Sequence, residues 1–76
     1  MKYYQYSEVL FYANKGNKTI CVSTDITAMS PVSRYNGNDT AKEVRKLPKT
    51  TKAIFDAAFD LALENIKKLR KEMQND

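Results

Sequence analysis

The chain has 76 residues, of which 42% are hydrophobic and 29% are charged. This composition excludes wholesale disorder, and the length predicts a single domain spanning residues 1–76. A domain of this size buries only about 60–65% of its unfolded surface, so association with another chain would add much to its stability. One cysteine, Cys21, excludes an intrachain disulfide and favours the cytoplasm over secretion.

Residues 2–13 are dense in tyrosine and other strand-forming residues, and they predict one long β-strand. Tyr4, Tyr6 and Tyr12 would share one face of that strand. Tyr3 and Phe11 would share the other face. Because both faces carry large side chains, we expect neither of them to be wholly exposed to solvent.

Residues 14–18 contain Gly16 and two asparagines, which is the composition of a turn. Residues 19–24 then alternate around Ile20 and Val22, with Cys21 on the opposite face. Strand, turn and strand together predict a β-hairpin with a five-residue turn at residues 14–18. Cys21, between two apolar residues, is expected to be a small packing residue.

Residues 25–38 have the least regular pattern of the chain. Residues 31–35 predict either a short third strand or a structured loop, and Asn36-Gly37 predicts a turn. Asn38 and Asp39 can each cap a helix over residues 40–47, which Pro48 would end. An extended segment is the alternative for residues 40–47.

A long helix is predicted from a cap at Thr50 or Thr51 to Gln74. Its apolar residues recur at intervals of four and three, which places them on one stripe: Phe55, Phe59, Ala62, Ile66, Leu69 and Met73. A helix of about 25 residues is roughly 37 Å long, whereas a compact domain of this size is about 30 Å across. The last turns must therefore project, fray or pack against another copy. The predicted fold class is α+β, a β-hairpin or three-stranded antiparallel sheet packed by this helix.

The stripe leads to a prediction about oligomeric state. Its last three residues, Ile66, Leu69 and Met73, would lie near or past the edge of the sheet. A twofold dimer would cover them by placing the same patch against itself. The stripe covers fewer than three heptads, which is too short for a stand-alone coiled coil.

Catalytic and metal-binding residues are sparse. The chain has no histidine, which removes the commonest general base and the commonest zinc ligand. Asp56 and Asp60 lie one helical turn apart, but they fall on the polar face among lysines, where a solvated surface is the better interpretation. There is no glycine-rich phosphate loop. We therefore expect no enzyme activity, no cofactor and no metal ion.

The net charge is +4, and most of it lies in residues 40–76. A basic cluster stands before the long helix: Lys42, Arg45, Lys46, Lys49 and Lys52. Solvated surface is the simpler interpretation of such a cluster. The alternative is a nucleic-acid-binding surface, with Arg34 and Tyr35 close to it.

The function predicted from these features is that of a non-catalytic binding protein that acts through protein–protein contacts. The expected interface residues are Tyr4, Tyr6 and Tyr12 from the strand, with Ile66, Leu69 and Met73 from the helix. In size and composition the chain is similar to small accessory proteins of phages or mobile elements, and we expect it to modulate or inhibit a host system. A nucleic-acid-binding accessory protein is the alternative. Residues 1–6 lack the apolar core of a signal peptide, and no apolar run is long enough to span a membrane.

Overall fold

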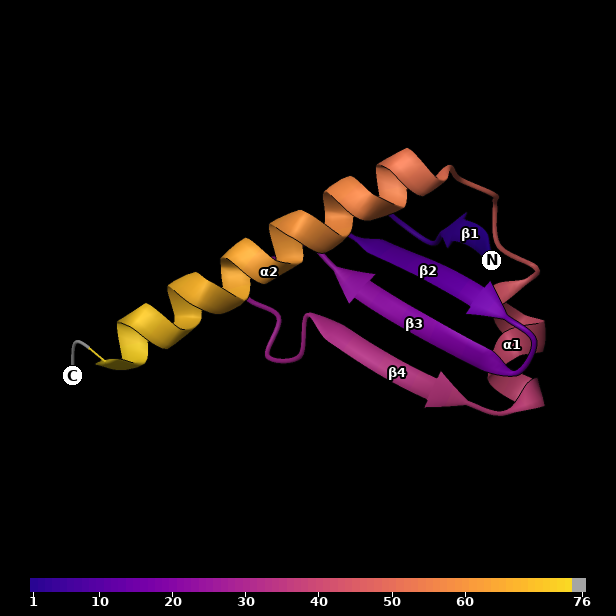
Figure 1. Ribbon diagram of the computed structural model, residues 1–76, viewed down its shortest axis with the longest axis horizontal. Coiled ribbons are helices and arrows are strands. Elements are labelled where there is room, and N and C mark those ends of the chain that lie inside the picture. The colour runs from indigo at the N-terminus through magenta and orange to yellow at the C-terminus, as the bar shows by residue number, and fades with distance from the viewer. Residues whose placement is uncertain (75–76) are drawn as a thin grey trace.

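The computed structural model describes residues 1–74 and shows an α+β fold, a four-stranded antiparallel sheet with two helices. The elements in chain order are β1 (Lys2–Gln5), β2 (Leu10–Lys15), β3 (Lys18–Ser23), β4 (Val32–Asn36), α1 (Asn38–Val44) and α2 (Lys52–Gln74). Each strand pairs with the next one along the chain (Figure 1). The predicted fold class is confirmed, with four strands where two or three were expected. Among residues 1–74 no helix combines the length and the apolar character that crossing a membrane requires.

The prediction of one strand over residues 2–13 was wrong, because the chain folds back on itself at residues 6–9. The Ser7 hydroxyl oxygen accepts hydrogen bonds from the backbone N–H groups of Val9 (3.2 Å) and Leu10 (3.1 Å). A serine that binds nearby backbone groups in this way offers the chain a turn in place of a strand. As a result Tyr4 and Tyr12, expected along one strand, lie opposite each other on two paired strands.

The hairpin of β2 and β3 is confirmed, with a shorter turn than predicted. Lys15 pairs with Lys18, so only Gly16 and Asn17 connect the strands. Gly16 has a φ of 61° while Asn17 does not have a positive φ. Glycine with positive φ at the first of two turn residues is typical of the type II′ turn, whose twist suits a hairpin. The tighter turn leaves Asn14 within β2, where it is buried.

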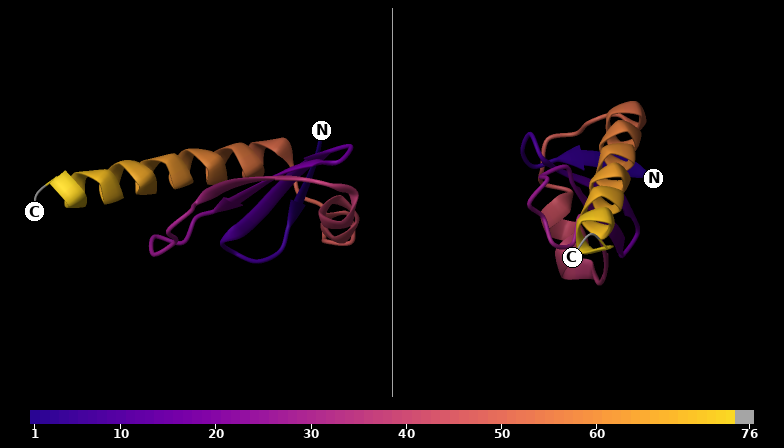
Figure 2. Two further views of the ribbon diagram at one scale, coloured as in Figure 1. Left: turned by 90° about the horizontal axis from the view of Figure 1, so that it is seen from below. Right: turned by 90° about the vertical axis from the view of Figure 1, so that its left-hand side faces the viewer.

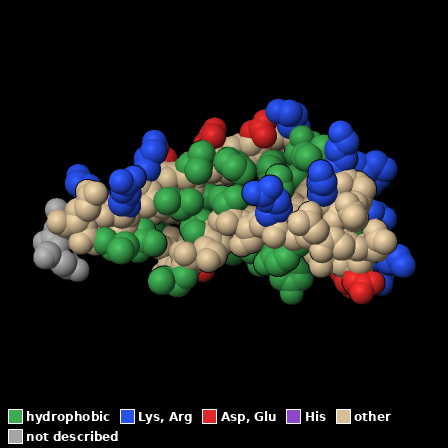
Figure 3. Space-filling view, turned by 60° about the horizontal axis from the view of Figure 1, so that its bottom comes forward, with side chains coloured by type: hydrophobic (Ala, Val, Ile, Leu, Met, Phe, Trp, Pro, Cys, Tyr) green, Lys and Arg blue, Asp and Glu red, His purple; other side chains and the backbone are tan. Residues whose placement is uncertain are grey.

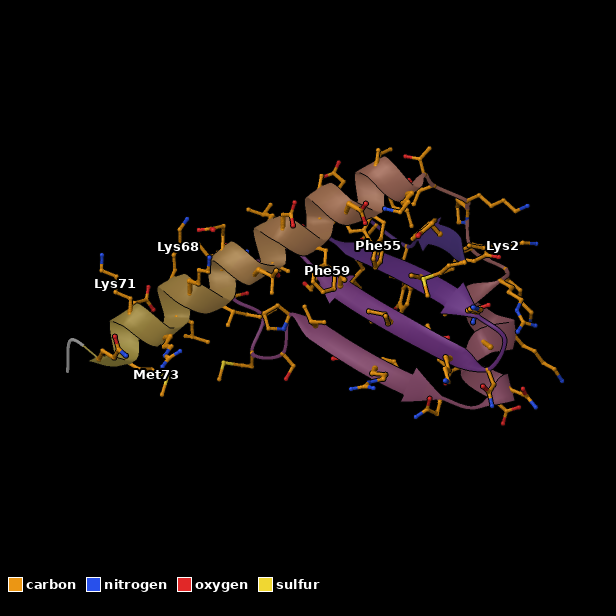
Figure 4. All side chains as sticks on the ribbon, viewed as in Figure 1. Lys2, Phe55, Phe59, Lys68, Lys71 and Met73 are labelled. Carbon is orange, nitrogen blue, oxygen red and sulfur yellow. The ribbon has the colours of Figure 1, made fainter. Side chains whose placement is uncertain are left out.

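The two helices lie on opposite faces of the sheet, as Figure 2 shows. Helix α2 covers one face and forms the core with it, through Phe55, Ala58 and Ala62 of the helix and Phe11, Ala13 and Val22 of the sheet. Phe55 and Phe59 point from α2 towards the sheet (Figure 4). The Phe55 ring lies 5.2 Å from that of Tyr3 and 6.2 Å from that of Phe59. The first half of the predicted stripe therefore packs as expected.

The second half of α2 extends past the sheet, as its length predicted. The helix begins after Thr51, whose hydroxyl oxygen accepts a hydrogen bond from the backbone N–H of Ile54 (3.2 Å), and its 23 residues span about 34 Å. The Asn65 amide donates a hydrogen bond to the Thr24 carbonyl (3.2 Å), and α2 continues past this contact towards its C-terminal end (Figure 1). The radius of gyration is 13.2 Å, whereas a compact chain of this length has about 11.4 Å.

Helix α1 lies on the other face, at the end of the sheet where β2 turns into β3 (Figures 1 and 2). It begins at Asn38, not at residue 40, and its N-cap is Gly37 with no side-chain cap. The prediction of Asn38 or Asp39 as the cap was therefore wrong. Gly37 has a φ of 131°, which side chains rarely tolerate, and this glycine lets the chain leave β4 and enter the helix at once.

Candidate protein-binding surfaces

Helix α1 covers only part of its face of the sheet, and the open part forms a groove. Three tyrosines line it, namely Tyr6 from the turn after β1, Tyr12 from β2 and Tyr35 from β4. The opposite wall is made by α1 and the segment after it, through Asp39, Thr40, Glu43, Val44 and Leu47. The groove has a volume of about 490 Å³. We call this surface the tyrosine groove.

The tyrosines of the groove differ in burial. Tyr6 is 64% exposed and Tyr35 is 45% exposed, whereas Tyr12 is half-buried. Tyr4 was expected in the same interface, but it is only 3% exposed and is buried. Tyr35 was expected near a basic surface and instead completes the groove. Its position was missed because it depends on the pairing of β4 with β3, which the irregular sequence of residues 25–38 did not reveal.

The charged residues of the groove are both acidic, although the chain as a whole has a net charge of +4. Glu43 pairs with Lys46 at 3.2 Å, and Asp39 forms no ion pair within residues 1–74. Burial, together with the neighbouring Cys21, raises the pKa of Tyr12 to about 12. Like any phenol, the Tyr12 hydroxyl is protonated at neutral pH and can donate a hydrogen bond. Aromatic faces beside carboxylates suit a cationic side chain and oppose a phosphate.

Helix α2 presents a second surface on the opposite side of the sheet. Ile54, Leu61 and Leu63 are exposed along its flanks. At its projecting end Leu69 is half-buried, Ile66 is exposed and Met73 is 71% exposed. Met73 lies at the far end of the helix (Figure 4). The predicted interface is thus divided, because the tyrosines and the helix residues lie on opposite faces of the sheet.

The predicted basic cluster is largely engaged in contacts within the chain. Arg45 donates hydrogen bonds to the Gly16 carbonyl (2.7 Å) and to Asn14 Oδ1 (3.2 Å), so it fastens α1 to the hairpin turn. Lys46 pairs with Glu43, and Lys52 pairs with Asp56 at 2.6 Å. Lys42 and Lys49 form no ion pair within residues 1–74.

Arg34 does not lie near this cluster, so its expected place was wrong. It pairs with Ile20 in the sheet and lines a hollow with Phe59, on the face that α2 covers. The sheet therefore separates Arg34 from α1. The reason is the alternation of β4, which sends Arg34 to one face and Tyr35 to the other.

Two lysines that the sequence did not single out lie beside Arg45. Lys2 from β1 and Lys15 from the hairpin line one shallow depression with Arg45. Figure 3 shows several Lys and Arg side chains at this end of the molecule, away from the C-terminus. The β1–β2 hairpin brings them together by pairing Lys2 with Asn14. Their proximity was missed because residues 2–13 were predicted to be one strand.

No family model matches the chain, and neither a curated protein nor a solved structure matches it. Within residues 1–74 no three histidine, cysteine or acidic side chains are grouped so as to hold a metal ion. The surfaces that the fold leaves open are therefore the guide to the function of this chain.

Proposed function

We propose that this chain is a non-catalytic binding domain that acts through contact with another protein, and that the tyrosine groove is its main contact surface. The groove is the observation that carries the proposal. Tyr6 and Tyr35 are exposed beside the half-buried Tyr12 at one face of the sheet. Tyrosine is enriched at protein interfaces because it offers a large contact area and a hydroxyl at a low entropic cost.

The charges of the groove favour a protein partner over a nucleic acid at this surface. Asp39, which forms no ion pair within residues 1–74, lies beside the tyrosines, and a free carboxylate repels a phosphate backbone. A lysine or arginine of a partner, by contrast, would be attracted both by the Asp39 carboxylate and by the tyrosine rings. We therefore propose a partner that inserts a basic side chain into the groove. A phage or mobile-element protein that modulates a host system would use such a surface to occupy its target.

The proposal is tested by affinity capture with paired variants. The immobilised wild-type chain is compared with the double variant Tyr6→Ser and Tyr35→Ser, in a nuclease-treated lysate of cells that encode it. Both tyrosines are exposed, so the fold should survive, which circular dichroism checks. Lys67→Ser, on the exposed side of α2, is the control. We expect a protein that the wild type and the control retain and the double variant loses. The same retention by all three chains would contradict the proposal.

Nucleic-acid binding is the second candidate, and it is favoured by the basic end of the molecule. Lys2 and Lys15 lie beside Arg45 there. Arg45 also holds α1 to the hairpin turn through its hydrogen bond to the Gly16 carbonyl. Binding to duplex DNA would weaken by roughly 0.9 log units per phosphate contact per decade of salt. A mobility shift at about 50 mM salt that Lys2→Glu with Lys15→Glu abolishes, and Lys67→Glu does not, would support this candidate. No shift in the wild type would exclude it.

A further inference from the structure

The two edges of the sheet differ in whether their outward backbone groups are hydrogen-bonded to another segment of the chain. At the β1 edge, the backbone N–H of Gln5 donates to the Pro48 carbonyl (2.9 Å), and the N–H of Thr50 donates to the Tyr3 carbonyl (2.9 Å). Lys49, between them, forms a β-bridge with Tyr4. The segment 48–50 therefore covers the outward backbone groups of β1, as native proteins commonly do with an edge.

The β4 edge has no such cover. The N–H of Ser23 donates to the Pro31 carbonyl (2.7 Å), and the N–H of Gly37 donates to the Asn17 carbonyl (2.8 Å). Because hydrogen-bonded residues alternate along an antiparallel strand, residues 31, 33, 35 and 37 face β3. The N–H and C=O groups of Val32, Arg34 and Asn36 must then face outward. Within residues 1–74 these groups have no backbone partner.

We infer that β4 is a docking edge, to which an extended segment of the partner protein adds as a fifth strand with a carboxylate opposite Arg34. This inference rests on the proposed protein-binding function and deepens it. Strand addition satisfies the outward backbone groups, and the alternate side chains of the added strand supply specificity. The open edge adjoins the tyrosine groove, because Tyr35 of β4 lines that groove.

Charge and shape beside the edge indicate the chemistry of the segment. Arg34 forms no ion pair or side-chain hydrogen bond within residues 1–74, and it lines a hollow of about 410 Å³ with Ile20, Val32 and Phe59. A strand paired with β4 would place every second side chain over this hollow. An acidic residue there would pair with Arg34, and an apolar residue two positions away would cover Val32 and Phe59.

A second copy of this chain fits the edge less well than a foreign strand. Pairing β4 with itself around a twofold axis would bring two Arg34 side chains onto the same face of the joined sheet. Like charges on neighbouring strands are destabilising, and a charged edge residue is a common device against self-pairing. Arg34 therefore favours a strand of another protein that carries a carboxylate on this face of the sheet.

The experiment selects peptides from a displayed library of random sequences on the wild-type chain. The affinity of each selected peptide is then measured for the wild-type chain and for the variants Asn36→Pro and Arg34→Glu. Proline at residue 36 removes an outward N–H and leaves the bonds to β3 intact, and circular dichroism checks the fold. Lys68→Glu on α2 is the matched charge reversal. We expect peptides that carry a carboxylate and lose about tenfold or more of their affinity for both β4 variants, but not for the control.

Hydrogen exchange gives a readout that is specific to strand addition. The amides of Val32, Arg34 and Asn36 should exchange fast in the free chain and slowly with the peptide bound. Failure to select any peptide, or affinity that Asn36→Pro leaves unchanged, would overturn the inference. Peptides that fail to bind only the double variant Tyr6→Ser and Tyr35→Ser would overturn the inference while supporting the tyrosine groove. Protection of these three amides in a dimer of the free chain would assign the edge to a second copy and also overturn it.

Discussion

Replacing Asn14 by alanine should destabilise the fold by more than any exposed substitution would, because Asn14 joins the hairpin turn to α1. Its side chain is 5% exposed, and its amide nitrogen donates to the carbonyls of Gly16 (3.2 Å) and Lys18 (3.1 Å) and to the hydroxyl of Thr19 (3.1 Å). Its amide oxygen accepts a hydrogen bond from Arg45 (3.2 Å). Asn14→Ala removes all of these at once.

The expected magnitude follows from that network. The two amide hydrogens and the amide oxygen count as about three hydrogen bonds, each worth about 1 kcal/mol net. Thr19 is fully buried, so its hydroxyl would lose a partner without gaining water. Arg45 is exposed, so water can replace the hydrogen bond that it loses, and this lowers the cost. We therefore expect a loss of about 2–3 kcal/mol in the free energy of unfolding. For a domain of this size that lowers Tm by roughly 10–20 °C.

Urea denaturation followed by circular dichroism measures this loss, with an unchanged m-value as the sign that the same surface unfolds. Asn17→Ala is the matched control, since Asn17 lies in the turn beside Asn14, is exposed and forms no side-chain hydrogen bond within residues 1–74. The control should change stability by less than about 0.5 kcal/mol. Equal effects of the two substitutions would refute the role given to Asn14.

Three further predictions concern the core, the groove and the projecting helix. Phe55→Ala should cost about 3–5 kcal/mol in urea denaturation, and a loss below about 1 kcal/mol would contradict the packing of α2 on the sheet. The unfolded Tyr12 phenol ionises near 10, whereas burial raises its folded pKa to about 12, so Tm should fall as pH rises from about 10 to about 12. Tyr12→Phe should flatten that fall, and an equal slope in both chains would exclude Tyr12 as its cause. If Ile66, Leu69 and Met73 form the twofold dimer contact that the sequence predicts, Leu69→Lys should shift the chain from dimer to monomer in sedimentation at about 100 μM, and a monomeric wild type would contradict that prediction.

The long helix was predictable because its pattern is local. The spacing of Phe55, Phe59 and Ala62 fixes the buried face over successive turns, and Thr51 provides the cap. The projection past the sheet followed from length alone. These features depend on residues close together in the sequence, where periodicity is a strong signal.

The sheet edges and the groove were not predictable in the same way. The break in the first strand depends on the Ser7 hydroxyl capturing two backbone N–H groups within an otherwise strand-like run. Once that break is missed, the register of β1 is lost, and with it the proximity of Lys2 to Arg45. The positions of Arg34 and Tyr35 depend on the pairing of β4 with β3, which the irregular local pattern of residues 25–38 does not reveal.

The most direct measurement places a photo-reactive aromatic residue in the tyrosine groove. Benzoylphenylalanine replaces Tyr6, which is exposed and whose removal leaves the core intact. The same residue at Lys67 on α2 is the control. On illumination in cells that encode the chain, we predict a covalent adduct with one protein from position 6 and none from position 67. Equal adducts from both positions, or adducts with nucleic acid alone, would contradict protein binding through the groove.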